Sequence, residues 1–202
     1  MTVTRKPTNL NGTRVIGNGS THDMLLFDGT ESLASAVSRV LCIALDQGHA
    51  AISIATREHQ KVIDQQLSRR GIDVARVRQS GQYRSFDAVE TLAEISLHGV
   101  PDTKRFEQLV GAVLQPALKT FARVCVFGEM VRLLWDAGRR EDAVRLEKLW
   151  SDLVTAKPVV LHCAYPGSAA TDPEHARAFN KICIEHHEVL AADGSKLDLP
   201  AR

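Results

Sequence analysis

The sequence predicts an α/β fold, a three-layer α/β/α arrangement in which a mostly parallel central sheet lies between helices. Three observations carry this prediction. Short apolar runs alternate with longer segments whose apolar residues recur at helical spacing, and glycines mark many of the boundaries. The runs are also apolar throughout, which is typical of strands that are covered on both faces.

Two β-α units open the ordered part of the chain. Residues 22–27 predict a strand followed by a helix over 28–48, and residues 50–55 predict a second strand followed by a helix over 56–70. The turn at 28–32 holds one glycine, two acids and no lysine. A nucleotide-binding loop would carry Gly-Lys-Ser/Thr there, so we expect no nucleotide binding at this turn.

The middle of the chain carries weaker signals. In order, the sequence predicts two short segments around a Ser80-Gly81 turn (74–77 and 83–86), a helix that opens with the capping box Asp87–Glu90 and ends at His98-Gly99, and a longer helix after Pro101. Pro116 lies in that longer helix and has no backbone N–H to donate. We therefore expect it to kink or shorten the helix.

The stretch from Phe127 to Trp150 organises the rest of the chain. Residues 123–127 predict a buried strand, and the chain turns at Gly128 into a helix whose first residue is Glu129. Open α/β sheets bind ligands at the carboxyl ends of their strands, which makes Glu129 the first candidate site residue. An acid at this position can also simply complement the dipole of the helix. Both readings stay open.

The last predicted β-α unit follows Pro158. Residues 159–164 predict a strand, and Asp172-Pro173 begins a helix with Cys183 and His186 on its apolar face. No linker suggests a second domain. The sequence therefore predicts a flexible N-terminal arm at 1–20, a single domain at 21–190 and a flexible C-terminal tail at 191–202.

Composition argues against several classes of function. The 25 basic and 24 acidic residues give a net charge of +1 and form no block of like charge, so no surface for nucleic acid or acidic membrane is expected. No apolar run reaches the roughly 18 residues of a membrane span, and the absence of an apolar signal core predicts a cytoplasmic protein. The four cysteines lie far apart in apolar settings, which predicts reduced, buried thiols.

Several side chains besides Glu129 are candidates for contacting a ligand. Glu147 lies three residues before Trp150, at the edge of a buried helical stripe. Tyr165 ends a strand, and its hydroxyl needs a hydrogen-bond partner. His22 begins a strand, where it can line a pocket or be a satisfied buried ring. Trp150 is also typical of a core residue.

A metal site at His162, Cys163 and His186 is an alternative, since imidazole and thiolate suit zinc or iron. The sequence lacks the local ligand spacing of known metal motifs, and a cysteine in an apolar strand is usually core. A nucleophilic Cys163 with His162 as its base is also disfavoured, because strand neighbours point to opposite faces. We therefore expect no metal and no cofactor.

Four motifs occur in an order and spacing typical of one family. They are His22 with Leu26-Phe27, Phe127-Gly-Glu-Met130, Leu146-Glu-Lys-Leu-Trp150 and Leu161-His-Cys-Ala-Tyr-Pro166. From about Thr21 to about Val189 the chain resembles the MEDS domain, the methanogen/methylotroph DcmR sensory domain. The family commonly has an aromatic pair where this chain has Leu26-Phe27, and an asparagine where it has Ser151.

The resemblance implies a sensory domain for small molecules, thought to be hydrocarbon derivatives, on a RecA/KaiC-like core without a working phosphate loop. It also implies a stand-alone member, because the helix-turn-helix or histidine-kinase segments found elsewhere in the family do not fit into the remaining residues.

Two hypotheses follow for function. In the first, the chain is a non-catalytic sensor that binds a small apolar or weakly polar molecule and relays its state to a kinase or regulator, and its ligand-binding residues are His22, Phe27, Glu129, Glu147, Trp150 and Tyr165. In the second, it is a degenerate RecA/KaiC-type module that only binds proteins or forms a homo-oligomer. The missing phosphate loop disfavours a third hypothesis, an enzyme that uses a nucleotide or a metal.

Overall fold

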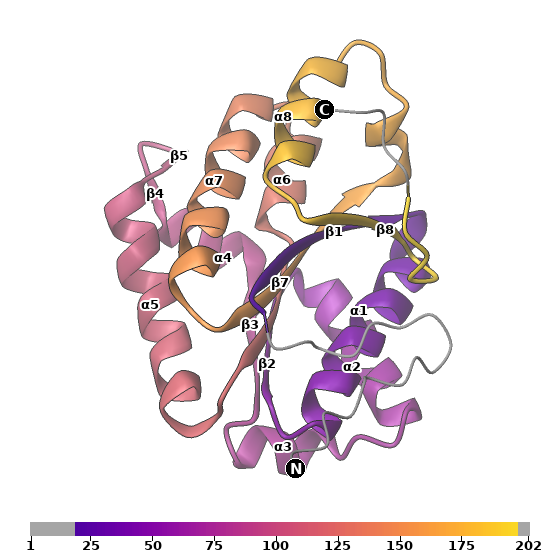
Figure 1. The fold of residues 1–202 in the computed structure, drawn as a ribbon, viewed down its shortest axis with the longest axis vertical. Coiled ribbons are helices and arrows are strands. Elements are labelled where there is room, and N and C mark those ends of the chain that lie inside the picture. The colour runs from indigo at the N-terminus through magenta and orange to yellow at the C-terminus, as the bar shows by residue number, and fades with distance from the viewer. Residues whose placement is uncertain (1–18, 198–202) are drawn as a thin grey trace, which may run out of the picture.

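The computed structural model describes residues 19–197, in which six parallel strands form one sheet between two layers of helices (Figure 1). The strand order is β3-β2-β6-β7-β1-β8. The strands are β1 (Thr21–Phe27), β2 (Ala50–Ala55), β3 (Tyr83–Asp87), β6 (Val124–Gly128), β7 (Val159–Pro166) and β8 (Glu188–Ala191). A separate antiparallel hairpin joins β4 (Ser96–Leu97) and β5 (Val100–Pro101). The predicted α/β fold is confirmed.

Helices cover both faces of the sheet, with α1 and α2 on one side and α5 and α7 on the other (Figure 1). The first layer contains α1 (Gly29–Asp46), α2 (Arg57–Arg69) and α3 (Val74–Gln79). The second layer contains α4 (Ala88–Glu94), α5 (Thr103–Thr120), α6 (Met130–Asp136), α7 (Arg140–Ala156) and α8 (Ala176–Ile184), with the 3₁₀ turn η1 at Gly167–Ala170.

Alternation along the strands divides the core into two apolar clusters. In β1, Met24 and Leu26 pack with the cluster that contains α5, α6 and α7, whereas Leu25 and Phe27 pack with the cluster of α1 and α2. Successive side chains of a strand point to opposite faces, which produces this division. It explains why the central strands β2 and β6 are almost entirely apolar, since each face is covered by helices.

Two segments in the middle of the chain depart from the prediction. The segment that begins at Val74 is the helix α3, because the carboxylate of Asp73 accepts a hydrogen bond from the backbone N–H of Arg76 and caps it. Helix α4 ends at Glu94 instead of continuing to His98-Gly99, since those two residues have φ values of 50° and 84° and form the turn of the β4–β5 hairpin. Pro116 does not shorten α5, which runs on to Thr120.

The end of the chain also differs. Helix α8 begins at Ala176, because the carboxylate of Asp172 accepts from the N–H of Glu174 and pairs with the ring of His175, which closes a local turn instead of capping a helix. β8 then pairs with β1, and the N–H of Leu197 donates to the carbonyl of Val189 at 2.8 Å. The expected tail at 191–202 is thus part of the fold as far as residue 197.

The rest of the two predicted flexible ends, residues 1–18 and 198–202, lies outside the described residues. Within residues 19–197, none of the helices is both long enough and apolar enough to cross a membrane.

Candidate functional site

The first candidate site lies where three neighbouring parallel strands end. The chain leaves β2 at Thr56, β3 at Asp87 and β6 at Glu129, and β2 is paired with both other strands. The N–H of Glu129 donates to the carbonyl of Ile54 at 2.9 Å, which fixes the acid beside the start of α2. The sheet order therefore places these polar groups at one edge, as predicted for Glu129.

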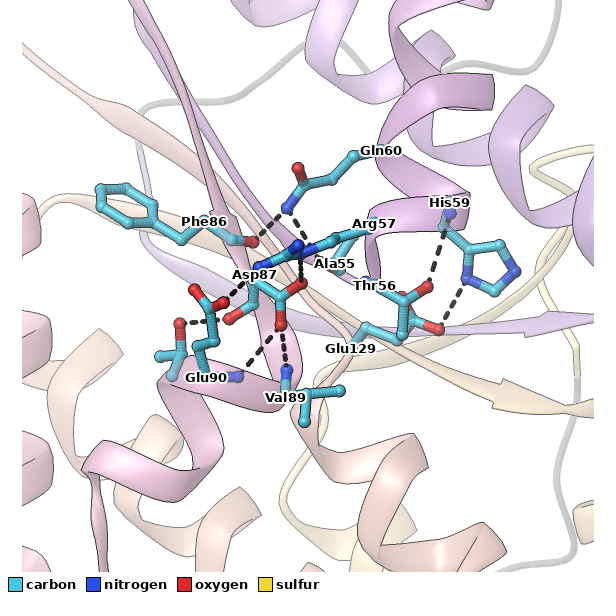
Figure 2. Close-up of polar contacts among 11 residues, drawn as sticks. Ala55, Thr56, Arg57, His59, Gln60, Phe86, Asp87, Val89, Glu90 and Glu129 are labelled. Atoms are coloured by element: carbon cyan, nitrogen blue, oxygen red, sulfur yellow. Dashed lines mark hydrogen bonds and ion pairs between the residues drawn. The ribbon is translucent and has the colours of Figure 1, made fainter.

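Glu129 is fully buried and its carboxylate accepts four hydrogen bonds. Oε2 accepts from the backbone N–H of Thr56 at 2.8 Å, and Figure 2 shows the carboxylate facing the ring of His59. Oε1 accepts from Nδ1 of His59 at 2.7 Å, and from Nε and Nη2 of Arg132 at 2.8 and 2.6 Å. The other ring nitrogen of His59 lies 3.1 Å from the hydroxyl of Thr30, so the network ties α1, α2 and α6 together.

The environment of Glu129 keeps it ionised. Burial raises the pKa of the carboxyl group, but the hydrogen bonds from His59 and Thr56 and the charge of Arg132 outweigh burial and lower the pKa below its usual value. An ionised carboxylate with four donors is already saturated. A small molecule that reached Glu129 would have to displace one of these donors.

A second polar network adjoins the first at the start of α2. Nε of Arg57 donates to Oδ2 of Asp87 at 3.1 Å, and the same guanidinium pairs with Glu90 (Figure 2). Asp87 also caps α4, because its Oδ1 accepts from the N–H groups of Val89 and Glu90. The start of α2 therefore contacts the start of α4 through Arg57 and contacts Glu129 through Thr56.

The second candidate site is a buried cluster on the α7 side of the sheet. His22 of β1, Glu147 of α7, Cys163 of β7 and His186, which follows α8, each place one ligand atom within 4.8 Å of the others. Nε2 of His22 lies 3.1 Å from Oε2 of Glu147 and 3.3 Å from Sγ of Cys163. Nε2 of His186 lies 3.6 Å from the same Oε2. All four side chains are fully or almost fully buried.

Hydrogen bonds orient three members of this cluster from behind. Nδ1 of His22 lies 3.0 Å from the hydroxyl of Ser151, and Nδ1 of His186 lies 2.8 Å from the carbonyl of Ile182. A carbonyl only accepts, so Nδ1 of His186 carries the proton of the neutral ring and Nε2 carries the lone pair. The hydroxyl of Tyr165 donates to Oε1 of Glu147 at 2.7 Å, which leaves Oε2 directed at the cluster.

The protonation states follow from burial and charge. Burial lowers the pKa of His186 to about 4, so its ring is neutral at pH 7. Burial raises the pKa of Glu147, but the two histidine rings and the Tyr165 hydroxyl outweigh burial and lower it, so its carboxylate is ionised. Burial and Glu147 together raise the pKa of the Cys163 thiol well above its usual value. A buried, protonated thiol is a poor nucleophile, although His22 lies beside it.

The six residues predicted to bind a ligand do not form one site. His22, Glu147 and Tyr165 meet in the buried cluster, and Trp150 packs nearby against Phe106 with ring centroids 4.9 Å apart. Glu129 belongs to the separate strand-end network. Phe27 is buried in the other apolar cluster, beside α1 and α2. The set therefore divides between two faces and one edge of the sheet.

The partners of these residues were not predicted from the sequence. His59 contacts Glu129 from α2, seventy positions earlier in the chain, and no local spacing links the two. Cys163 and His186 do converge, but with His22 and Glu147. His162 is separated from them because neighbouring strand residues face opposite sides of the sheet. Arg132 contacts Glu129 from α6, and its position three residues after Glu129 is a local signal for this ion pair.

The fold is similar to that of a solved structure. The chain is similar in structure to a KaiC-like protein from the hyperthermophilic archaeon Pyrococcus horikoshii, with a TM-score of 0.57 and 9% sequence identity, over 86% of this chain and 71% of the other. At this identity the likeness shows the fold alone. The RecA/KaiC-like core is confirmed.

The family follows from the sequence match. Residues 21–181 match the model of the MEDS family, described as the methanogen/methylotroph DcmR sensory domain. The match covers most of the chain, which therefore belongs to this family of sensory domains. No curated protein matches the chain.

Proposed function

We propose that this chain is a non-catalytic sensory domain that binds a small, weakly polar molecule and relays its state to a signalling protein. The observation that carries the proposal is the match of residues 21–181 to a family of sensory domains. The resemblance to that family points to a hydrocarbon-derived molecule. The strand-end network around Glu129 is the proposed place of the signal, because ligands of open α/β sheets bind at this edge.

The relay runs through the first turn of α2. A molecule that takes a donor from Glu129 changes the bond to the N–H of Thr56 or to the ring of His59, and both belong to the start of α2. Arg57, the next residue, pairs with Asp87 at the start of α4. A shift of α2 on ligand binding therefore moves α4, because the contact between Arg57 and Asp87 differs between the ligand-free and the ligand-bound state.

The proposed output surface lies on and after α4. Val89 is 58% exposed, and Leu97 and Val100 of the β4–β5 hairpin are 44% and 39% exposed. Large exposed aliphatic side chains so near the end of the relay are suited to contact a protein partner, for which we propose a kinase or regulator.

A native mass spectrum of the protein purified from its own host tests the proposal directly. We expect a retained small molecule, and we expect Glu129→Gln to reduce retention by about tenfold or more, the loss of a charge-assisted bond. Glu58→Gln is the matched control, because Glu58 is an exposed acid in the first turn of the same helix. Equal retention by both variants would place the molecule elsewhere.

One observation favours the alternative, a protein-interaction module without a ligand. Glu129 is saturated by its own neighbours, and each of the six predicted ligand residues is buried. A packed strand end needs no small molecule to satisfy its polar groups. If the protein from its host carries no small molecule yet still binds its partner, this second function replaces the first.

A further inference from the structure

The cluster of His22, Glu147, Cys163 and His186 plays no part in the proposed relay. We infer that these four side chains form a binding site for a divalent transition metal, with Zn²⁺ as the ion that fits best. The inference does not depend on the sensory function. It rests on the distances, the burial, the charges and the surrounding hydrogen bonds of the cluster.

The distances fit tetrahedral coordination. Zinc bonds to nitrogen, oxygen and sulfur of about 2.0–2.3 Å place neighbouring ligand atoms about 3.3–3.8 Å apart. Nε2 of His22 lies 3.1 Å from Oε2 of Glu147 and 3.3 Å from Sγ of Cys163, and Nε2 of His186 lies 3.6 Å from that Oε2. The widest pair is within 4.8 Å. Contraction by roughly 1 Å at the widest pair completes the tetrahedron.

The buried negative charge of Glu147 favours binding of a cation in the cluster. Glu147 is fully buried, and no Lys or Arg pairs with it within residues 19–197. Its Oε2 lies 3.1 Å from Nε2 of His22 and 3.6 Å from Nε2 of His186. A dication bound by one carboxylate, one thiolate and two neutral imidazoles gives a net charge of zero, so the buried carboxylate is compensated. Coordination breaks the S–H bond of Cys163, forms a sulfur–metal bond and releases one proton to solvent.

The surroundings match those of protein metal sites. Histidine ligands usually donate their second ring N–H to a fixed acceptor, and His186 does so to the carbonyl of Ile182. The Nδ1 of His22 is held by the Ser151 hydroxyl, which also donates to the carbonyl of Glu185. The Tyr165 hydroxyl fixes Glu147 through Oε1. These hydrogen bonds use Nδ1 of each histidine and Oε1 of Glu147, so that Nε2 of each histidine and Oε2 of Glu147 face the centre of the cluster.

The ligand types select the metal class. Thiolate and imidazole favour zinc, iron(II) and cobalt(II) over magnesium and calcium, which prefer oxygen ligands. Four protein ligands without access to solvent are typical of a structural site. The metal would fasten β1, α7 and β7 to the segment after α8, where Nδ1 of His187 also lies 3.0 Å from the N–H of His22.

Cobalt titration of the metal-free full-length chain tests the site. We expect one Co²⁺ per chain, a thiolate-to-cobalt charge-transfer band, its loss on addition of Zn²⁺, and a higher melting temperature with either metal. Cys163→Ser should abolish the band and weaken cobalt binding by about 100-fold or more. Loss of a residue that only supports a ligand weakens binding by about 10–100-fold, and loss of a ligand itself should have at least the larger effect. Tyr165→Phe should keep the band and weaken binding by about 10–100-fold.

Cys125→Ser is the matched control, because Cys125 is an equally buried strand cysteine in the other apolar cluster. It should keep both the band and the affinity. Absence of a charge-transfer band in the unaltered protein overturns the inference even if Cys163→Ser does not fold. The inference also fails if Cys163→Ser and Cys125→Ser bind cobalt alike, in which case the cluster is a hydrogen-bonded part of the core. If cobalt binds as expected, elemental analysis of protein purified from its host identifies the natural metal.

Discussion

Replacing Glu129 by glutamine keeps the shape of the side chain and removes its charge. The carboxylate accepts from Thr56 through Oε2, and from His59 and Arg132 through Oε1, and it is fully buried. Glutamine has one acceptor oxygen and one NH₂ group. If its oxygen faces His59 and Arg132, its NH₂ group faces the N–H of Thr56, and two donors are left opposed.

The magnitude follows from these contacts. An unsatisfied buried donor costs about 1–3 kcal/mol, and the loss of a charged acceptor weakens the remaining bonds to Arg132, which is 20% exposed. We expect a total loss of about 2–4 kcal/mol. For a chain of 202 residues this corresponds to a fall of about 5–15 °C in melting temperature. An acid that only complemented the helix dipole would contribute no more than about 1 kcal/mol.

Thermal and denaturant unfolding at several pH values give the assay. The lowered pKa of Glu129 means that its contribution to stability is present above the unfolded value of about 4.3 and is lost as pH falls through the lower folded value. The difference between the parent protein and Glu129→Gln should therefore be full at pH 7 and shrink below about pH 4. Glu58→Gln should change stability by less than about 0.5 kcal/mol.

A loss below about 1 kcal/mol at pH 7 would refute the reasoning, because it would mean that the four bonds to Glu129 contribute no more than a helix dipole. A loss that stays constant down to pH 3 would refute the assignment of the effect to the ionised carboxylate.

Three further predictions concern the fold and its nucleotide chemistry. We expect no ATP hydrolysis and no ATP affinity tighter than millimolar, because the turn at 28–32 has one glycine and no lysine, unlike a phosphate loop; micromolar binding in calorimetry would contradict this. Phe106→Ala should cost about 3–5 kcal/mol in denaturant unfolding, since Phe106 is 1% exposed, whereas Val89→Ala should cost less than about 0.5 kcal/mol. Gly71→Ala should cost roughly 1–2 kcal/mol because its φ is 90°, while Gly111→Ala in α5 should raise stability by up to about 1 kcal/mol; equal effects would contradict the backbone argument.

Most of the sheet could be predicted because its strands are buried on both faces. Residues 50–55 are apolar except for one serine, and the structure places β2 over the same range. β8 was missed because it has four residues and its one partner among the named strands is β1, so its pattern is too short to distinguish from a tail. The start of α8 was misplaced because Asp172 forms a local turn with His175. An aspartate before a proline is typical both of a helix cap and of such a turn, so the sequence does not distinguish them.

The candidate sites were predictable in part. Glu129 could be found because the end of a strand is a local feature, but its partner His59 depends on how α2 crosses the sheet. The buried cluster could not be assembled from sequence, since it requires β1 to lie beside β7. That adjacency places Met24 opposite Cys163, and so brings His22 to the same face as the thiol.

The position of β1 in the sheet also sets the order in which the protein can be completed. Among the strands of residues 19–197, β1 is synthesised first, yet its two neighbours in the sheet are β7 and β8, which are synthesised last. Residues 22 and 186 are 164 positions apart (186 − 22), which at about 5–20 residues per second separates their synthesis by roughly 8–30 seconds. During translation His22 therefore lacks these neighbours at first, and the core around it closes only after β7 and β8 have been synthesised.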